Sequence, residues 1–404
     1  MYKFSFMEEW KTYKLADICD LIPGFAFKSA DFGDYEDRAI KIGDIQPPYV
    51  NYKTTSGLDV HHYTPSKLAK YIVRKGDFVL AMTGATIGKI GRYIHDTPAY
   101  LNQRVLLFKP HSSVNSKFVY YSLLSPLFQK YVLNHIDSET AQPNISGKSV
   151  SGFEINLPSR KVQDRIADLM SAIDDKIDLN TRINHNLEEQ ARALYKSWFV
   201  DFEPFEKDTD GIPIGWKQVS LSDIMGYSGG SQPPASEFIS EPLPGYIRFI
   251  QIRDYESDSH ITYIPISKRN KLCDENDILI ARYGASLGRI CYGLKGAYNV
   301  ALAKVTPVKS YYREFLRCYL SDSSFYEGIN LKGNRAVQAG FNQSDINSFK
   351  LLFPSDDQVM QHFELRLSVL FSLRQRIAVE NKELVAIRET LLPVLMSDKS
   401  LLLD

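Results

Sequence analysis

Two long stretches of the chain repeat apolar side chains every three or four residues, while the remainder alternates short apolar runs with Gly and Pro turns. The first stretch predicts a helix from Val162 to Phe199, and the second predicts one from Asp357 to Met396 with Ser355 as a possible N-cap. A block of β-rich runs precedes each helix, as in "DFVLAM" and "DILIARY", and a shorter helical patch follows those runs at 116–133 and 311–329.

The apolar positions of both long helices fall in heptads. At 1.5 Å per residue each helix is on the order of 55–60 Å long, too long to lie inside one globular block. Asn180 interrupts the first seam, and Pro393 should kink or end the second helix. We expect an antiparallel coiled coil between the two helices; the alternative is that each folds back on its own block. The expected seam residues are Ile166, Ile173, Ile177, Leu187, Leu194, Phe363, Leu370, Ile377, Leu384 and Leu391.

The chain is an internal duplication. Landmarks recur in the same order: "WKTYKLADIC" as "WKQVSLSDIM", "GDFVLAMTGATIGKIGRY" as "NDILIARYGASLGRICY", and "INLPSRKVQDRI" as "FKLLFPSDDQVMQHF". The predicted fold class is α/β in the mixed α+β sense, with two duplicated globular domains joined by the two long helices. The predicted segments are a first domain at 1–157, a helix at 158–202, a linker at 203–215, a second domain at 216–353 and a helix at 354–404.

The composition indicates a globular protein but points to no catalytic activity. The 404 residues carry no net charge, 44% are hydrophobic and 24% are charged, which is ordinary for a globular protein. The N-terminus lacks a signal-peptide pattern, no run is long enough to span a bilayer, and we expect a cytoplasmic protein. Four scattered cysteines and eight histidines indicate neither a disulfide framework nor a metal site. The two blocks are mildly basic, whereas the helices and linker are acidic.

Three motifs resemble catalytic signatures and fail on inspection. "GATIGK" at 84–89 is too short for a phosphate-binding loop and lacks the hydroxyl that would bind Mg²⁺. It is either a structural turn between strands or a loop that approaches DNA. "QPPY" at 46–49 lacks the Asn or Asp of adenine methyltransferases and reads as a turn. Pro354-Ser355-Asp356 with Glu380 and Lys382 lies along one helix and cannot converge on a metal. No catalytic centre follows from this sequence.

The order of motifs resembles the specificity subunit of type I restriction-modification enzymes over essentially the whole chain. The segments most typical of that family are "LADICDLIPGFAFKSADF", "GDFVLAMTGATIGKIG", "YLNQRVLLFKP" and "ALYKSWFVDFEPF". The resemblance implies two target recognition domains, each reading one half of a bipartite asymmetric site in double-stranded DNA, and a coiled coil that sets their spacing. It also implies docking of two methyltransferase subunits, association with restriction and translocase subunits, and no chemistry in this chain. S-adenosylmethionine, ATP and Mg are then expected in the partner subunits, with no cofactor here.

By position in the turn-rich loops, polar and basic residues are the candidates for DNA contact, although a solvated surface role is about equally consistent for any one of them. They are Lys28, Thr83, Thr86, Lys89, Gln103, Arg104, Gln232, Arg253, Arg282, Tyr283, Ser286, Arg289 and Arg335. Trp198, Phe199 and Phe202 are candidate partner anchors; the alternative is that they pack on their own linker. The second helix ends without an equivalent aromatic exit, so the two methyltransferase sites need not be identical.

Two other functions compete with DNA recognition. One is a duplicated coiled-coil scaffold that organises other proteins without DNA readout. The other is an enzyme that methylates alone, which the missing cofactor loop disfavours.

Overall fold

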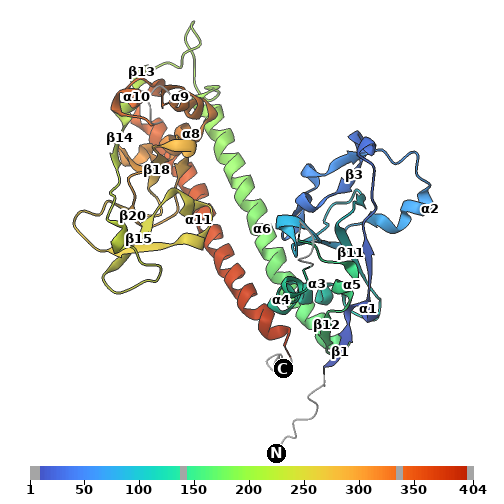
Figure 1. Ribbon diagram of the computed structural model, residues 1–404. Coiled ribbons are helices and arrows are strands. Elements are labelled where there is room, and N and C mark those ends of the chain that lie inside the picture. Colours follow the sequence, from blue (N-terminus) through green and yellow to red (C-terminus); the bar gives the residue numbers. More distant parts are fainter. Residues whose placement is uncertain (1–9, 137–142, 334–339, 398–404) are drawn as a thin grey trace, which may run out of the picture. The chain divides into compact units, whose positions relative to one another are not determined.

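The computed structural model describes residues 10–136, 143–333 and 340–397 of the chain (Figure 1). These residues form two compact units. Unit 1 contains the described residues up to Leu179 together with those from Asn381 onward, and unit 2 runs from Asn180 to Glu380. Each unit therefore combines one globular block with half of each long helix, a division that cuts across the helices rather than between blocks and helices.

Unit 1 holds three sheets of short strands. The pair β1 (Lys11–Lys14) and β12 (Glu154–Leu157) is antiparallel and closes the block at its two chain ends. A four-stranded sheet has the order β6-β3-β10-β7, with strands Ser56–Leu58, Phe32–Ile40, Ala99–Leu101 and Ile72–Val73. A six-stranded sheet has the order β2-β11-β8-β9-β5-β4, with strands Cys19–Pro23, Val105–Pro110, Phe78–Ala81, Ile90–Arg92, Tyr49–Val50 and Ile45–Gln46.

Unit 2 repeats this plan except for one hairpin. Its sheets are β13-β22, β16-β15-β20-β17 and β14-β21-β18-β19. The strands are Trp216–Ser220, Lys350–Pro354, Thr262–Pro265, Tyr246–Ile250, Gly296–Tyr298, Leu272–Cys273, Met225–Gly229, Leu302–Pro307, Ile278–Ala281 and Ile290–Cys291. The additional hairpin β4-β5 of unit 1 turns at Pro47-Pro48, which confirms that "QPPY" is a turn. The duplication thus extends to sheet order.

Short helices complete each block. In unit 1 they are α1 (Leu15–Ile18), α2 (Pro65–Leu68), α3 (Ser116–Leu124), α4 (Pro126–Asn134) and α5 (Gly147–Ser151). In unit 2 they are α7 (Leu221–Ile224), α8 (Arg313–Ser321), α9 (Ser323–Gly333) and α10 (Gln343–Asn347). The equivalent strands β8 and β18 are buried on both faces, which explains their uninterrupted apolar sequences.

The long helices are α6 (Arg160–Phe199) and α11 (Asp357–Leu395), close to the predicted bounds. The N-cap of α11 is Asp356 and not Ser355, since the backbone N–H of Gln358 donates to the Asp356 carboxylate at 2.9 Å. Ser355 instead continues the pairing of β13 with β22, because its backbone N–H donates to Gly215 O. Pro393 lies in the last turn, and the helix ends at Leu395 as expected. In unit 1 the start of α6 pairs with the end of α11, and in unit 2 the end of α6 pairs with the start of α11, so the pairing is antiparallel.

The predicted seam is only partly a helix–helix seam. Ile166, Ile173, Leu187, Phe363 and Ile377 are buried; Ile177, Leu194, Leu370, Leu384 and Leu391 are half-buried. Ile166 belongs to the core of the first block, and Phe363 belongs to that of the second. Leu392, Leu395 and Met396 of the C-terminal region also enter the first core. The helices therefore pair with each other and also cover the blocks, so both arrangements considered from the sequence occur together.

Candidate DNA-recognition loops and the helix pair beneath them

Three loops meet at one end of the six-stranded sheet in unit 1. The Gly24 N–H donates to Val105 O at 2.9 Å, and the Gln103 N–H donates to Phe25 O at 2.8 Å. The Met82 N–H donates to Arg104 O at 2.9 Å. These backbone hydrogen bonds hold the segment after β2, the start of the β8-β9 loop and the β10-β11 turn side by side.

The same three loops meet in unit 2. Gly230 N donates to Leu302 O at 3.0 Å, and Arg282 N donates to Ala301 O at 2.9 Å. A Cβ atom on Gly230 would lie 2.0 Å from the carbonyl oxygen of Asn299, and one on Gly24 would lie 1.9 Å from that of Asn102. Only glycine allows the segments after β2 and β14 to approach the β10-β11 and β20-β21 turns this closely.

The β8-β9 loop of unit 1 and the β18-β19 loop of unit 2 are tight turns built in the same way. Gly84 and Gly88 have φ of 72° and 83°, and Gly284 and Gly288 have 70° and 82°. The backbone N–H of Gly88 donates to Ala81 O, and that of Lys89 donates to Thr86 O, so both are used inside the turn. This arrangement agrees with rejecting a phosphate cradle, which needs N–H groups directed at a ligand. The structural turn is confirmed, and an approach to DNA by its exposed side chains stays a prediction.

The candidate DNA contacts differ in how far they reach the surface. Thr83 is an exception to the expected exposure: it is 5% exposed because the bridge to Asn144 covers it. Arg289 is half-buried and pairs with Glu256 at 2.6 Å, and the Arg282 guanidinium lies over the Tyr283 ring. Arg335 lies outside the described residues. The exposed candidates are Lys28, Lys89, Gln103, Arg104, Gln232, Arg253 and Tyr283, while Thr86, Arg282 and Ser286 are half-buried.

Two residues of these loops were missed from sequence. Asn102 in the β10-β11 turn and Asn299 in the β20-β21 turn occupy the same place in the two units, and among the described residues no donor reaches the buried side-chain oxygen of either. The signal was present, since "YLNQR" and "AYNVA" carry Asn at the aligned position. Amide side chains can recognise adenine, and these two lie where the three loops converge.

An acidic residue fixes the segment that carries Lys28. Asp31 accepts hydrogen bonds from the Tyr63 hydroxyl at 2.6 Å, the Lys28 backbone N–H at 2.7 Å and the His62 ring at 3.1 Å. The Tyr63 hydrogen bond is the main reason why the pKa of the Asp31 carboxyl lies below its ordinary value. The loop after β2 is therefore held by a charge-assisted network rather than by packing alone.

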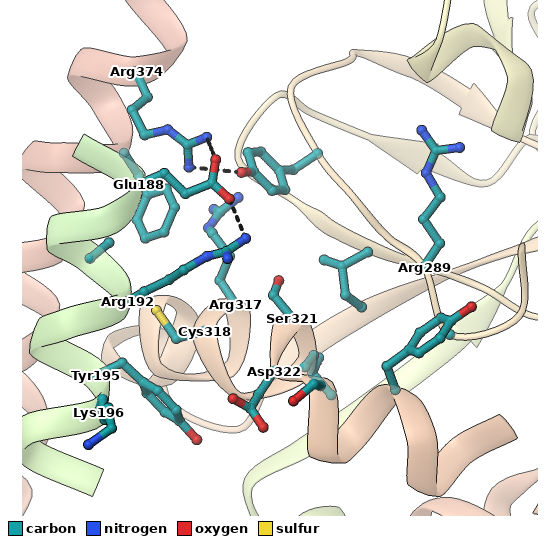
Figure 2. A pocket seen from close by; sticks show the side chains of 18 of the residues that line it. Glu188, Arg192, Tyr195, Lys196, Arg289, Arg317, Cys318, Ser321, Asp322 and Arg374 are labelled. Atoms are coloured by element: carbon teal, nitrogen blue, oxygen red, sulfur yellow. Dashed lines mark hydrogen bonds and ion pairs between the residues drawn. The ribbon is translucent and has the colours of Figure 1, made fainter. Parts of the chain in front are cut away.

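In unit 2 the helix pair lines a cavity of about 950 Å³ together with the β18-β19 loop and α8. Glu188 of α6 accepts from Arg374 of α11 at 2.8 Å and from Arg192 at 2.7 Å. Arg374 also donates to the Tyr292 hydroxyl at 3.1 Å. Figure 2 shows these contacts on one side of the cavity and Arg289 on the other. The lining carries more basic than acidic side chains, and Arg289 and Ser286 of the lining belong to the β18-β19 loop.

In unit 1 a buried carboxylate occupies the comparable part of the helix pair. The Asp174 side chain is 5% exposed and accepts from the Tyr121 hydroxyl at 2.7 Å and from Arg388 at 3.1 Å. Arg92 lies 4.0 Å away and donates to the Tyr49 hydroxyl at 3.2 Å. Each unit thus joins its block to both long helices through a polar cluster.

The candidate partner anchors pack largely within unit 2. Phe199 is 8% exposed and makes edge contacts with Phe315 and Phe363 at 4.7 Å, so its ring fills the unit's own core rather than presenting an anchor. Trp198 packs edge-on against Phe205 of the linker, and Phe202 packs against Trp216. The linker packing that was considered as the alternative is therefore present; partner contact by Trp198 and Phe202 stays a prediction.

The described part of the chain contains no group of three or more His, Cys, Asp or Glu side chains arranged to hold a metal ion. Within the same residues, no helix has the length and apolar character needed to cross a membrane. Burial raises the pKa of Cys19 and Cys273 to about 12 and that of Cys291 to about 11. These thiols stay protonated near neutral pH and pack as small apolar groups.

Fold and loops together define a class of protein: two copies of an α+β block with clustered polar loops, each built onto one end of an antiparallel helix pair. Residues 7–189 match the type I restriction modification DNA specificity domain. The chain is 24% identical to the HindI specificity subunit of Haemophilus influenzae, over 97% of this chain and 99% of that protein. It is 28% identical to the MjaIX specificity subunit of Methanocaldococcus jannaschii, over 65% of this chain and 70% of that protein.

A solved structure shares the fold. The S subunit of a type I restriction-modification system from M. genitalium superposes with a TM-score of 0.65 at 15% identity, covering 98% of both chains. Nearly the whole chain is thus similar in sequence to a type I restriction enzyme specificity subunit, and its fold is that of the solved S subunit.

Proposed function

We propose that this chain directs a type I restriction-modification complex to a bipartite, asymmetric DNA site, with each block reading one half-site. The observation that carries the proposal is the pair of loop clusters: their backbone is the same in both units, while their side chains differ. The β8-β9 turn carries Thr86 and Lys89 in unit 1, and the β18-β19 turn carries Tyr283, Ser286 and Arg289 in unit 2. A common frame with different side chains suits two readers of unlike sequences.

In this proposal the chain performs no catalysis. Two methyltransferase subunits dock on the helical regions, and restriction and translocase subunits join the complex. S-adenosylmethionine, ATP and Mg belong to those partners, and the complex works in the cytoplasm. This division of labour rests on the family and on the lack of a catalytic motif in the sequence.

Methylome sequencing tests the proposal. The chain is co-expressed with the methyltransferase subunit of its own locus in a host that lacks other methylases. We expect N6-methyladenine in one bipartite asymmetric motif. A second strain carries residues 216–353 from a relative, and a third carries residues 1–157 from a relative; each exchange should change a different half-site and leave the other intact.

The competing function is a scaffold without DNA readout. Assembly of the complex with no new methylation, and with equal affinity for all DNA sequences, would favour the scaffold. Copurification of the methyltransferase subunit with this chain provides the assembly control for that comparison.

A further inference from the structure

The cavity of unit 2 lies where unit 1 has a cluster of hydrogen-bonded side chains. In unit 1 the Asp174 carboxylate of α6 accepts from the Tyr121 hydroxyl of α3 at 2.7 Å and from Arg388 of α11 at 3.1 Å. Tyr121 is fully buried and the Asp174 side chain is 5% exposed. These side chains therefore occupy the space between the first block and its part of the helix pair.

On the block side of unit 2, a small side chain replaces a large one of this cluster. The buried Phe118 of α3 corresponds in the repeat to the buried Phe315 of α8. In the same register Cys318 takes the place of Tyr121. A thiol is much smaller than a phenol ring, and the change leaves no hydroxyl to donate to a carboxylate.

The same spacing along the chain relates the long helices and exchanges the two other members of the cluster. Phe371 stands where unit 1 has Asp174, and Ala191 stands where unit 1 has Arg388. Both replacements line the cavity, as does Cys318. The cavity of about 950 Å³ therefore takes the place of the polar cluster of unit 1.

Two arginines that line this cavity have more donors than the described residues satisfy. Arg317 is 2% exposed and donates through Nε to Glu314 at 2.7 Å, but no acceptor among the described residues reaches its Nη1. Arg374 donates to Glu188 at 2.8 Å, and its buried Nε is likewise without an acceptor in the described part of the chain. A buried guanidinium N–H without an acceptor is costly, and an anion in the cavity can supply one.

Three further cations line the cavity and are free to exchange partners. They are Arg192 and Lys196 of α6 and Arg289 of the β18-β19 loop, and Figure 2 shows Arg289 across the cavity from Arg192. Arg289 pairs with Glu256, and Lys196 pairs with Asp201, in each case with one member about two-thirds exposed. Such surface pairs contribute little stability, so a ligand anion can replace the carboxylates at small cost.

The two acidic residues of the lining are already engaged by the protein. Glu188 accepts from Arg374 and Arg192. Asp322 caps α9 by accepting from the backbone N–H of Ser324 at 2.9 Å and from its hydroxyl at 2.5 Å. A cationic ligand would have to displace these contacts, whereas an anion meets the basic side chains. The donor set therefore favours an anion.

The remainder of the lining suits a flat group rather than a bare ion. It is mainly aromatic and apolar, with Tyr195, Tyr292, Tyr326 and Leu320 among its members. Tyr326 is 44% exposed, so part of its ring is available for stacking. The volume falls within the roughly 300–1,000 Å³ of small-molecule sites, and a double helix is too wide to enter a cavity of that size.

We propose that this cavity of unit 2 binds a nucleotide, with its phosphate groups among Arg192, Arg289 and Arg317 and its base against Tyr326. The nucleotide is a ligand of this chain, separate from the ATP expected in the partner subunits. Because the cluster around Asp174 fills the equivalent space of unit 1, each chain has one such site.

Isothermal titration calorimetry of the full chain tests the proposal, with ADP, adenosine and inorganic phosphate as separate probes. Ala191→Arg refills the cavity with the side chain that unit 1 has at the equivalent position. Arg192→Gln removes one cation from the lining. Arg182→Gln is the matched control, since Arg182 is an exposed arginine of the same helix that does not line the cavity.

We expect ADP to bind at one site per chain, and adenosine and phosphate to bind at least about tenfold more weakly, because each offers only part of the contacts. Arg192→Gln should weaken ADP binding by about tenfold, the loss of one charge-assisted hydrogen bond. Ala191→Arg should abolish it, and Arg182→Gln should bind as the wild type does. A thermal melt checks the fold of Ala191→Arg, and if that variant unfolds, Arg192→Gln decides.

A wild-type chain that does not bind ADP overturns the inference, as does an Arg192→Gln variant with wild-type affinity. Phosphate that binds as tightly as ADP would overturn the assignment to a nucleotide. Displacement of ADP by a DNA duplex of unrelated sequence would assign these cations to the DNA instead. None of these results alters the expected methylation pattern, so this inference and the proposed function fail separately.

Discussion

At the scale of single residues, the loops depend on positions where only glycine fits. Gly288 has a φ of 82°, and a Cβ atom there would lie 2.6 Å from Ile329 Cγ2 on α9. Gly293 has a φ of 93° with nothing within 4 Å of the same hypothetical atom. An alanine at position 293 would therefore meet backbone strain alone, whereas an alanine at position 288 would meet backbone strain and a steric clash.

We expect Gly293→Ala to cost about 1–2 kcal/mol of unfolding free energy through its left-handed backbone. Gly288→Ala should cost a further 1–3 kcal/mol, roughly the penalty of overpacking, because α9 must also move. Urea unfolding of both variants measures the difference. Equal losses would show that the contact with α9 relaxes freely.

Asp31 gives a prediction about acid stability. Since the folded-state pKa of this carboxyl is lowered, its ionised form stabilises the fold at neutral pH, and that contribution is lost as the pH falls below the ordinary value of 3.8. Asp31→Asn should lower Tm at pH 7 and lose less additional Tm than wild type between pH 5 and pH 3. The exposed Asp34→Asn serves as the control and should follow the wild-type curve. Parallel curves for Asp31→Asn and wild type would refute the assignment.

Sequence reasoning located these loops but not the state of each side chain. It found the repeated glycine turn because the spacing of small residues survives in both copies. It placed Thr83 among exposed candidates, although a bridge from Asn144, distant in sequence, buries that residue. Burial by a remote segment leaves no local signal, whereas the aligned Asn102 and Asn299 could have been found by comparing the copies.

At the scale of elements, heptad spacing predicted the bounds of both long helices within a few residues. It did not predict what their apolar faces cover, because a helix stripe that packs on a sheet has the same period as one that packs on a helix. Tyr195 and Phe371 are buried against the second block, although neither belongs to the predicted seam.

Phe363 shows how much one such position contributes. Its side chain is fully buried and contacts the rings of Trp198 and Phe199. Phe363→Ala should lower the unfolding free energy by about 3–5 kcal/mol. Leu365→Ala, two residues along the same helix and 67% exposed, should change it by less than about 0.5 kcal/mol. Chemical denaturation of the two variants tests whether this end of α11 belongs to a block core.

At the scale of the whole molecule, the internal repeat predicted two similar blocks, and the matching strand orders, apart from the extra β4-β5 hairpin, confirm that prediction. The repeat did not predict that each long helix is divided between the units. A repeated sequence does not indicate which of the two blocks each half of a helix packs against. Leu392, Leu395 and Met396 follow the second block in sequence, yet they complete the core of the first.

This sharing can be tested by hydrogen exchange on the full chain. Replacing Leu392, Leu395 and Met396 with Ala should reduce amide protection in β8 and β11 of unit 1 and leave β18 and β21 of unit 2 near their wild-type values. Phe363→Ala should produce the opposite pattern. Loss of protection in both units to the same extent from either change would mean that the units unfold as one.

The division of the helices also determines the order in which the chain can finish folding as it is synthesised. All residues of unit 2 have been made by the time the ribosome reaches Glu380, although unit 1 begins first. The core of unit 1 waits for side chains up to Met396. During synthesis the N-terminal domain of a protein usually folds first. In this chain the second block is the first whose core residues have all been synthesised. The exposed apolar face of the first block is therefore the surface for which a nascent chain of this design would need a chaperone.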